Sequence, residues 1–148
     1  GEFYQFAGLR FSPKPRQKPH PPILIGGSSL AARGRVARIG NGWHTLRQSP
    51  RQFAEGRADI LQRVAAAGRD PGGLHFSIAL PLRFSGEAPS APVRDRTALT
   101  GTSDDMAETL RAYGEAGADE IAIGISSADM AENTDAMARF MQQIWPAV

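Results

Sequence analysis

Two stretches of the chain alternate between large and small positions as strands do. In residues 75–84 every second residue is large and apolar, from Phe76 to Phe84. Residues 120–126 repeat the pattern, with isoleucines on one side and alanine and glycine among the residues on the other. Because successive side chains of a strand point to opposite faces of its sheet, both stretches predict strands with one large face.

Shorter apolar runs predict further strands. Ile23–Ile25 lacks alternation, which is typical of a parallel strand buried on both faces. Residues 42–46 are another strand candidate. Residues 3–11 predict a short hairpin that turns near Ala7-Gly8. Five prolines within residues 12–22 predict an extended linker, and the polar stretch 85–98 predicts a loop.

Apolar positions at helical spacing, bounded by capping residues, predict helices between these strands. Including their caps, the expected helices span about residues 29–39, 49–68, 102–117 and 128–144. Ser49 followed by Pro50 is a strong helix start, and Thr102 is an N-cap with acidic residues near the positive end of its helix. The residues expected to bury the last helix are Met137, Phe140, Met141 and Ile144.

The resulting order is βα, repeated four times, which implies parallel strands joined by right-handed crossovers. Four such units are half of an eight-stranded (β/α)8 TIM barrel. We therefore expect an α/β fold in which residues 1–22 form a hairpin insertion and a proline-rich linker and residues 23–148 form the second half of a barrel. An open flavodoxin-like sheet is the structural alternative.

Composition narrows the classes of function. The chain has 148 residues, 41% of them hydrophobic and 22% charged, and it has no cysteine. It contains no apolar run near the roughly 18 residues that a membrane span requires, and no secretory signal is evident. We therefore expect a cytoplasmic protein that contacts no membrane. The absence of cysteine and the wide spacing of the three histidines also argue against a metal site.

Charge is unevenly distributed. Residues 1–69 hold 12 Lys/Arg and 3 Asp/Glu, a net +9, whereas residues 70–148 hold 5 and 12, a net −7. A basic half can bind an anionic ligand or nucleic acid, but solvated helix faces explain it as well. The arginines of the first helix have no aromatic residues among them, so we expect no nucleic-acid partner.

The junction of the first strand and first helix is the strongest candidate site. Ile25, Gly26, Gly27, Ser28 and Ser29 end the strand and open the helix. Glycine lets a backbone approach a ligand closely, and a helix N-terminus offers free N–H groups and a positive dipole end. These residues predict a phosphate site, although a tight turn that merely needs glycine is the alternative. The spacing does not match the dinucleotide fingerprint G-x-G-x-x-G.

The end of the next strand carries a second set of candidates. Trp43 could stack against a flat ring, His44 could donate a hydrogen bond to it, and Arg47 could meet an anionic group. The alternatives are a core tryptophan, a capped histidine and a solvated arginine. We assign no catalytic residue.

Several segments, in this order, resemble the luciferase-like monooxygenase superfamily, and within it the branch that depends on coenzyme F420. They are Phe11-Ser12-Pro13-Lys14-Pro15, Lys18 to Ser28, Arg38 to Trp43, Ala67 to Pro71, Gly101-Thr102, Tyr113 to Glu120 and Pro146. The family fold is a (β/α)8 barrel about twice as long as this chain. The resemblance implies that this chain is the second half of such a barrel and that a first half is its partner.

The resemblance also implies an activity. Members transfer hydride to or from a deazaflavin or flavin, so the implied cofactor is coenzyme F420, with FMN as the alternative, and the substrate is a small organic molecule. The strand end at Gly26-Gly27-Ser28 is implied to hold the cofactor phosphate, and the region of Trp43 and His44 to line the ring pocket. The competing hypothesis is an inactive half-barrel that self-associates without a cofactor. In either case we expect a homo-oligomer.

Overall fold

The computed structural model describes residues 2–125 and 127–148. Its strands and longer helices are β1 (Leu24–Gly26), α1 (Leu30–Ile39), β2 (Gly42–Leu46), α2 (Pro50–Ala66), β3 (His75–Arg83), β4 (Leu99–Thr100), α3 (Ser103–Glu115), β5 (Glu120–Ile125) and α4 (Met130–Arg139). The predicted βα alternation is confirmed. The strand predicted for 120–126 ends at Ile125, and Ser126 lies outside the described residues.

All strand pairs in the sheet are parallel, and β3 is its central strand. β2 pairs with β1 on one side and with the first half of β3 on the other. β5 pairs with β3 over residues 77–82 of β3, and the short β4 pairs with the last two residues of β3, Leu82 and Arg83. β1, β4 and β5 therefore each have a single strand partner among the described residues.

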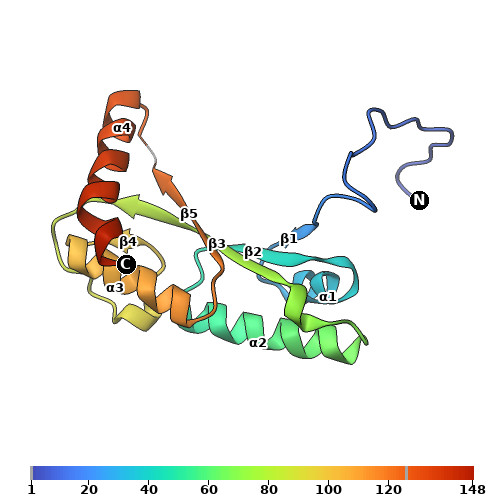
Figure 1. Ribbon diagram of the computed structural model, residues 1–148, viewed down its shortest axis with the longest axis horizontal. Helices are drawn as coiled ribbons and strands as arrows, with labels where there is room; N and C mark the ends of the chain where they lie inside the picture. The colour runs from blue at the N-terminus through green and yellow to red at the C-terminus, as the bar shows by residue number, and fades with distance from the viewer. Residues whose placement is uncertain (1, 126) are drawn as a thin grey trace.

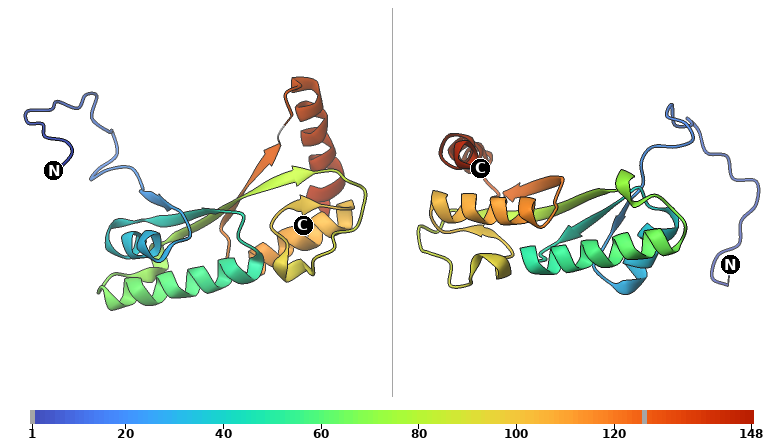
Figure 2. Two further views of the ribbon diagram at one scale, coloured as in Figure 1. Left: turned by 180° about the vertical axis from the view of Figure 1, so that it is seen from behind. Right: turned by 60° about the horizontal axis from the view of Figure 1, so that its bottom comes forward.

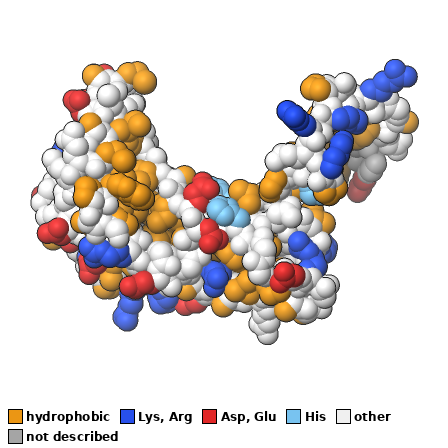
Figure 3. All heavy atoms as spheres, in the orientation of Figure 1, with side chains coloured by type: hydrophobic (Ala, Val, Ile, Leu, Met, Phe, Trp, Pro, Cys, Tyr) orange, Lys and Arg blue, Asp and Glu red, His pale blue; other side chains and the backbone are white. Residues whose placement is uncertain are grey.

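Helices cover one face of the sheet and leave the other open. Figure 1 shows α1, α2 and α3 together on one side, while α4 stands beside β5 at one end. Figure 2 confirms from two further directions that α2 and α3 lie on the same side. The buried core lies between the sheet and these helices and includes Trp43, Phe53, Phe76, Ile78 and Tyr113. In Figure 3 the space between α4 and the N-terminal segment is a hollowed surface.

The register defines which residues share the open face. Gly26, His44 and Ser77 lie side by side in one row across β1, β2 and β3. Two residues further along, Leu46 pairs with Ala79, and Ala79 pairs with Ala122. The large residues of β3 and β5 therefore face the helices, as their alternation predicts, and small residues form much of the open face.

The predicted hairpin at residues 3–11 is wrong. No strand forms between residues 2 and 23, and this segment projects away from the sheet (Figure 1). Phe3, Tyr4 and Phe6 are 74–85% exposed. A two-stranded hairpin is marginal unless its apolar side chains pack on something else, and the side chains of Phe3 and Phe6 remain largely exposed.

Two burial expectations are also wrong. β1 is not buried on both faces: Leu24 is 45% exposed, because it lies on the open face of the sheet together with Gly26. In the last helical stretch Phe140 and Ile144 are buried as predicted, but Met137 and Met141 are more than half exposed. The regular helix, which includes Met137, ends at Arg139, and the chain continues as a π-helical turn over Phe140–Ile144, which shifts the direction of Met141.

Candidate functional site

The turn between β1 and α1 brings the predicted phosphate-site residues together at the carboxyl end of the sheet. Gly26 ends β1, and Gly27 follows with φ +102°. This left-handed conformation is strained for any residue with a Cβ atom. Ser29 is the N-cap of α1, and its hydroxyl accepts the N–H of Ala32 at 3.2 Å. Gly26 to Ser29 are all exposed.

Ile25 differs from its neighbours in this group. It is only partly exposed and packs against the hydrophobic core, in the same row of the sheet as Trp43 and Phe76. Its side chain is therefore directed away from the open face. Ile25 contributes to the turn by holding β1 against the helices, and it can offer a ligand only backbone atoms.

Trp43 fixes the turn from behind. Its indole N–H donates to the carbonyl of Gly27 at 2.6 Å, while the N–H of Gly27 donates to the carbonyl of His44 at 3.2 Å. The indole ring is 0% exposed and stacks on Phe53, with ring centroids 5.3 Å apart. Trp43 thus has no ring face open to a ligand, and its contact with the site is through Gly27.

His44 lies on the open face, as the strand alternation requires. Its Nδ1 is hydrogen-bonded to the hydroxyl of Ser77 at 2.9 Å, and it remains partly exposed. Sequence reasoning overlooked Ser77, which is only 1% exposed and orients this ring. The signal was present in β3, where Ser77 is the one hydroxyl on the small-residue side.

Arg47 follows β2 at the same end of the sheet. It is exposed, and its φ of +52° makes it the one non-glycine residue in the described part of the chain with a left-handed backbone. Together with Leu46, Ala79, Leu80, Pro81 and Gly124 it lines a cavity of about 190 Å³. The structure therefore places Gly26, His44 and Arg47 along one edge of the open face, with Trp43 beneath them.

The electrostatics of the β1–α1 turn favour an anion. The first turn of α1 holds no acidic side chain. The N–H groups of Leu30 and Ala31 have no acceptor within the described part of the chain. Free N–H groups and a positive dipole end together bind phosphate oxygens well.

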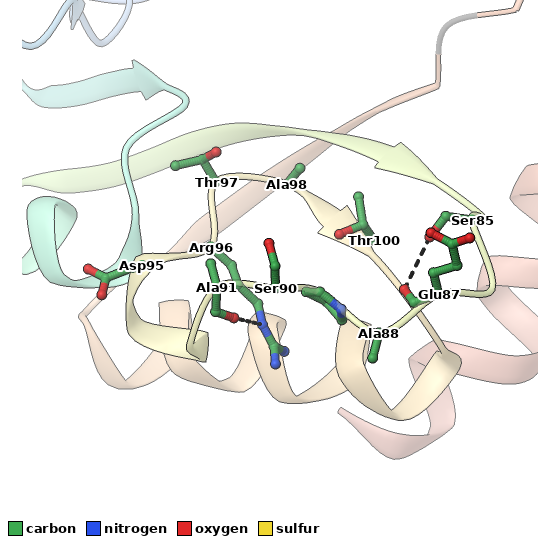
Figure 4. Close-up of a pocket in the computed structure, with 11 residues that line it drawn as sticks. Ser85, Glu87, Ala88, Ser90, Ala91, Asp95, Arg96, Thr97, Ala98 and Thr100 are labelled. Carbon is green, nitrogen blue, oxygen red and sulfur yellow. Dashed lines mark hydrogen bonds between the residues drawn. The ribbon is translucent and has the colours of Figure 1, made fainter.

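A second hollow lies in the loop that connects β3 to α3. Figure 4 shows its two arms, with Ser85 and Glu87 on one and Thr97, Ala98 and Thr100 on the other. The hollow measures about 330 Å³.

The guanidinium of Arg96, which belongs to this loop, is directed toward α3. It donates to the carbonyl of Asp105 at 3.0 Å and to the carboxylate of Glu108 at 2.9 Å. Its charge is therefore used within the fold. The hollow offers hydroxyl groups but no free cation, and the β1–α1 turn is the better phosphate site.

Other kinds of site find no support in the described residues. Within 2–125 and 127–148, no three or more His, Cys, Asp or Glu side chains are arranged to hold a metal ion. No helix in these ranges is long and apolar enough to cross a membrane.

Comparison with known proteins identifies the family. Residues 1–88, more than half of the chain, match the model of the luciferase-like monooxygenase family. A 68-residue stretch is 40% identical to an FMNH2-dependent dimethylsulfone monooxygenase from Pseudomonas putida. That match covers 46% of this chain but only 19% of the relative.

Solved structures extend the likeness to nearly the whole chain at the level of the fold. A monooxygenase from Streptomyces bottropensis matches with a TM-score of 0.72 at 19% identity, over 97% of this chain and 53% of its own. An F420-dependent secondary alcohol dehydrogenase, solved with an F420-acetone adduct, matches with a TM-score of 0.66 at 13% identity, over 88% and 50%. This chain thus spans about half the length of these structures and has the fold of half a TIM barrel. It belongs to the luciferase-like monooxygenase family.

Proposed function

We propose that this member of the luciferase-like monooxygenase family binds the phosphate of a flavin or deazaflavin cofactor at the β1–α1 turn. The observation that carries the proposal is Gly27, whose left-handed backbone is held between Trp43 and His44 at the carboxyl end of β1. In barrels of this kind ligands bind at that end of the strands. Relatives named as FMNH2-dependent and F420-dependent support both cofactors.

The residues of the turn fit a phosphate group. A Cβ atom added at Gly26 would meet no atom within 4 Å, so the space beside this strand end is open. At Gly27 the nearest atom would be the Cβ of Ala32 at 3.5 Å. Ser28 and Ser29 add exposed hydroxyls, and the first N–H groups of α1 point outward from the same turn.

In this proposal the cofactor supplies hydride transfer with a small organic substrate, and this chain supplies binding and orientation. Coenzyme F420 is the first choice and FMN the second. His44, oriented by Ser77, lies on the open face beside the proposed phosphate site and can hydrogen-bond to the ring system. The remaining ring contacts come from the other half of the barrel, which is the proposed partner of this chain.

Replacement of Gly26 by Asp tests the phosphate site. The new carboxylate would enter open space without backbone strain, because a φ in the left-handed range occurs at Gly27 and not at Gly26. Repulsion between carboxylate and phosphate should weaken binding of F420 and FMN by about 100-fold, because close like charges cost several kcal/mol. Cofactor binding is measured by fluorescence titration with this chain alone and with the first half of a family barrel joined before residue 1.

Gly73→Asp is the matched control. Gly73 also has open space around it and lies far along the chain, before β3. This variant should bind both cofactors normally. Riboflavin, which lacks the phosphate, should bind the Gly26→Asp variant nearly as well as the parent. Equal loss of riboflavin and FMN binding would show that the substitution damages the turn rather than a phosphate site.

A second candidate function is self-association without a cofactor, and the two free ends of the sheet favour it. Beside β5, the apolar residues Ile123, Ile125, Met137 and Met141 line a cavity of about 410 Å³. At the other end Leu24 is exposed on β1. Unpaired strand edges and apolar surface promote association. Two copies could pair β5 of each with β1 of the other, and sedimentation equilibrium should then give a dimer; a monodisperse monomer would exclude this.

A further inference from the structure

Arg47 has an unusual backbone for its residue type. A φ of +52° places it in the left-handed region, where a side chain costs free energy that glycine would not. Strained residues persist when the surrounding structure determines them, and they gather at functional sites. The conformation of Arg47 therefore calls for an explanation in terms of what the side chain does.

The surrounding structure fixes this turn firmly. Ser49 and Gln52 form a reciprocal capping box that sets the start of α2. The buried hydroxyl of Tyr113 lies 2.6 Å from the carbonyl of Gln48 and 2.9 Å from that of Arg96. The residue after Arg47 is thus tied to α3 and to the loop before β4. The backbone at Arg47 is therefore fixed before any ligand arrives, so that only its side chain loses conformational freedom on binding.

The side chain of Arg47 is free to bind a ligand. In the part of the chain that the structure describes, Arg47 has no ion pair, hydrogen bond or ring contact. Most arginines of the folded body are engaged: Arg51 pairs with Asp95, and Arg96 pairs with Asp105 and Glu108. Arg47 instead lines the cavity on the open face, whose floor is made by the small residues Ala79 and Gly124.

Arg83 is a second free arginine at this end of the sheet. It lies on the same side of β3 as Ala79 and Pro81 and is exposed, also without a partner among the described residues. Ala79 pairs with Leu46, next to Arg47, and Arg83 lies four residues further along β3. Because Arg47 follows Leu46, it is level with Leu80, and at about 3.3 Å per residue the two arginines are about 10 Å apart along the strand direction, close enough for their fields to overlap. Arg83 itself lines the neighbouring hollow, together with Glu132 and Asp135.

We infer that Arg47, assisted by Arg83, binds the anionic group of an organic acid whose carbon chain lies on Ala79 and Gly124. A guanidinium pairs with carboxylate, sulfonate or phosphate through two parallel hydrogen bonds, and the cavity accepts a short apolar chain. This inference rests on the proposed function and narrows its substrate class to anionic compounds. The same oxyanion chemistry could come from the cofactor phosphate, and the test separates the two sources.

The test compares hexane-1-sulfonate with hexan-1-ol, which share a chain short enough for the cavity but differ in charge. Binding to the folded chain is followed by NMR titration. Arg47→Ala should weaken sulfonate binding at least about 10-fold and leave hexanol binding unchanged. Arg83→Ala should have a smaller effect, and Arg38→Ala, which removes an exposed arginine at the far end of α1, should have none. Equal losses in the Arg38 and Arg47 variants would overturn the inference.

Arg47→Gly distinguishes a binding role of Arg47 from a purely structural one. Glycine relieves the left-handed strain, so the variant should have a higher Tm than the parent while it loses sulfonate binding. A lower Tm would contradict the claim that strain is held there for binding.

The ratio of FMN to riboflavin affinity then identifies the source of the anion. An unchanged ratio in Arg47→Ala supports a substrate acid, and a ratio that falls toward one assigns Arg47 to the cofactor phosphate and overturns the substrate assignment. Gly26→Asp should leave sulfonate binding intact, so failure of the phosphate site and failure of this inference are distinguishable.

Discussion

The N-termini of α1 and α3 have the same local backbone and N-cap but differ in the space and the charges around them. Each helix follows a strand end, a left-handed glycine and a hydroxyl N-cap: Gly27 and Ser29 before α1, Gly101 and Thr102 before α3. At α3 a Cβ atom on Gly101 would lie 2.7 Å from both Pro89 and Asp105, so the turn is filled by its own chain. At Gly27 the nearest atom would be 3.5 Å away.

The two helix N-termini also differ in charge, because only α3 has acidic residues in its first turn. Asp105 accepts from both the N–H and the hydroxyl of Thr102, and these hydrogen bonds, with a smaller contribution from Arg96, hold the pKa of Asp105 below its usual range. α1 has no acidic residue in its first turn. α3 thus satisfies its positive end internally, whereas α1 leaves the same potential available to an external anion. This difference, rather than the presence of glycine, distinguishes a candidate phosphate site from a structural turn.

The largest expected effect comes from the support beneath the α1 turn. Trp43→Ala removes a fully buried ring that stacks on Phe53 and is expected to cost about 3–5 kcal/mol in the free energy of unfolding. Trp43→Phe keeps an aromatic ring but loses the hydrogen bond to Gly27, at a cost nearer 1 kcal/mol. Urea unfolding measures both values.

Hydrogen exchange at the Gly27 amide then separates packing from positioning. If the indole N–H positions the turn, Trp43→Phe should speed exchange at Gly27 and weaken FMN binding although most of the packing remains. Unchanged exchange and affinity in this variant would mean that β1 pairing alone fixes the turn.

A smaller loss is expected at α3. Thr102→Ala removes the N-cap and should cost about 1 kcal/mol at neutral pH without any change in cofactor affinity. Ser29→Ala, its counterpart at α1, should cost a similar amount but also weaken FMN binding. An equal effect of both variants on FMN binding would erase the proposed difference between the two helix ends.

The pH dependence of Thr102→Ala has a definite sign. The pKa of Asp105 is lowered in the folded state, so its contribution is present above the unfolded pKa and is lost as pH falls through the folded pKa. Thr102→Ala keeps the backbone N–H bond to this carboxylate but removes the hydroxyl bond, so the part of the stability difference between parent and variant that comes from the hydroxyl should disappear below about pH 4. A constant difference down to pH 2 would contradict this assignment.

These variants depend on caps, and caps are the features that local sequence predicted best. Ser29, Ser49 and Thr102 were each recognised as helix starts, because a short polar side chain and its target N–H lie within three residues. The strands β2 and β3 were also predicted to within one residue, β2 from a short apolar run and β3 from alternation, both of which are local signals.

The features that were predicted wrongly or missed depend on residues far away in sequence. The hairpin at 3–11 would need a surface to pack on, and β4 forms by pairing with the end of β3 across a long loop. The face to which Trp43 points follows from its register with Phe76, 33 residues later, and the hydroxyl beneath His44 follows from the same pairing. The turn was therefore predictable as a candidate, whereas its support from Trp43 and the strain at Arg47 required the structure.

The smallest change tests the comparison most directly, because it should move two properties in opposite directions. Ala31 is exposed at the second position of α1, where α3 has Asp104. Ala31→Asp supplies the missing acid, and its favourable interaction with the helix dipole should stabilise the protein by about 0.3–1 kcal/mol. The same charge should compete with phosphate and weaken FMN binding, while riboflavin binding stays constant. Asp104→Ala should lower the stability of the protein by a similar amount and leave its affinity for FMN unchanged. If Ala31→Asp stabilises the protein and FMN still binds as before, the open end of α1 is only an unoptimised cap.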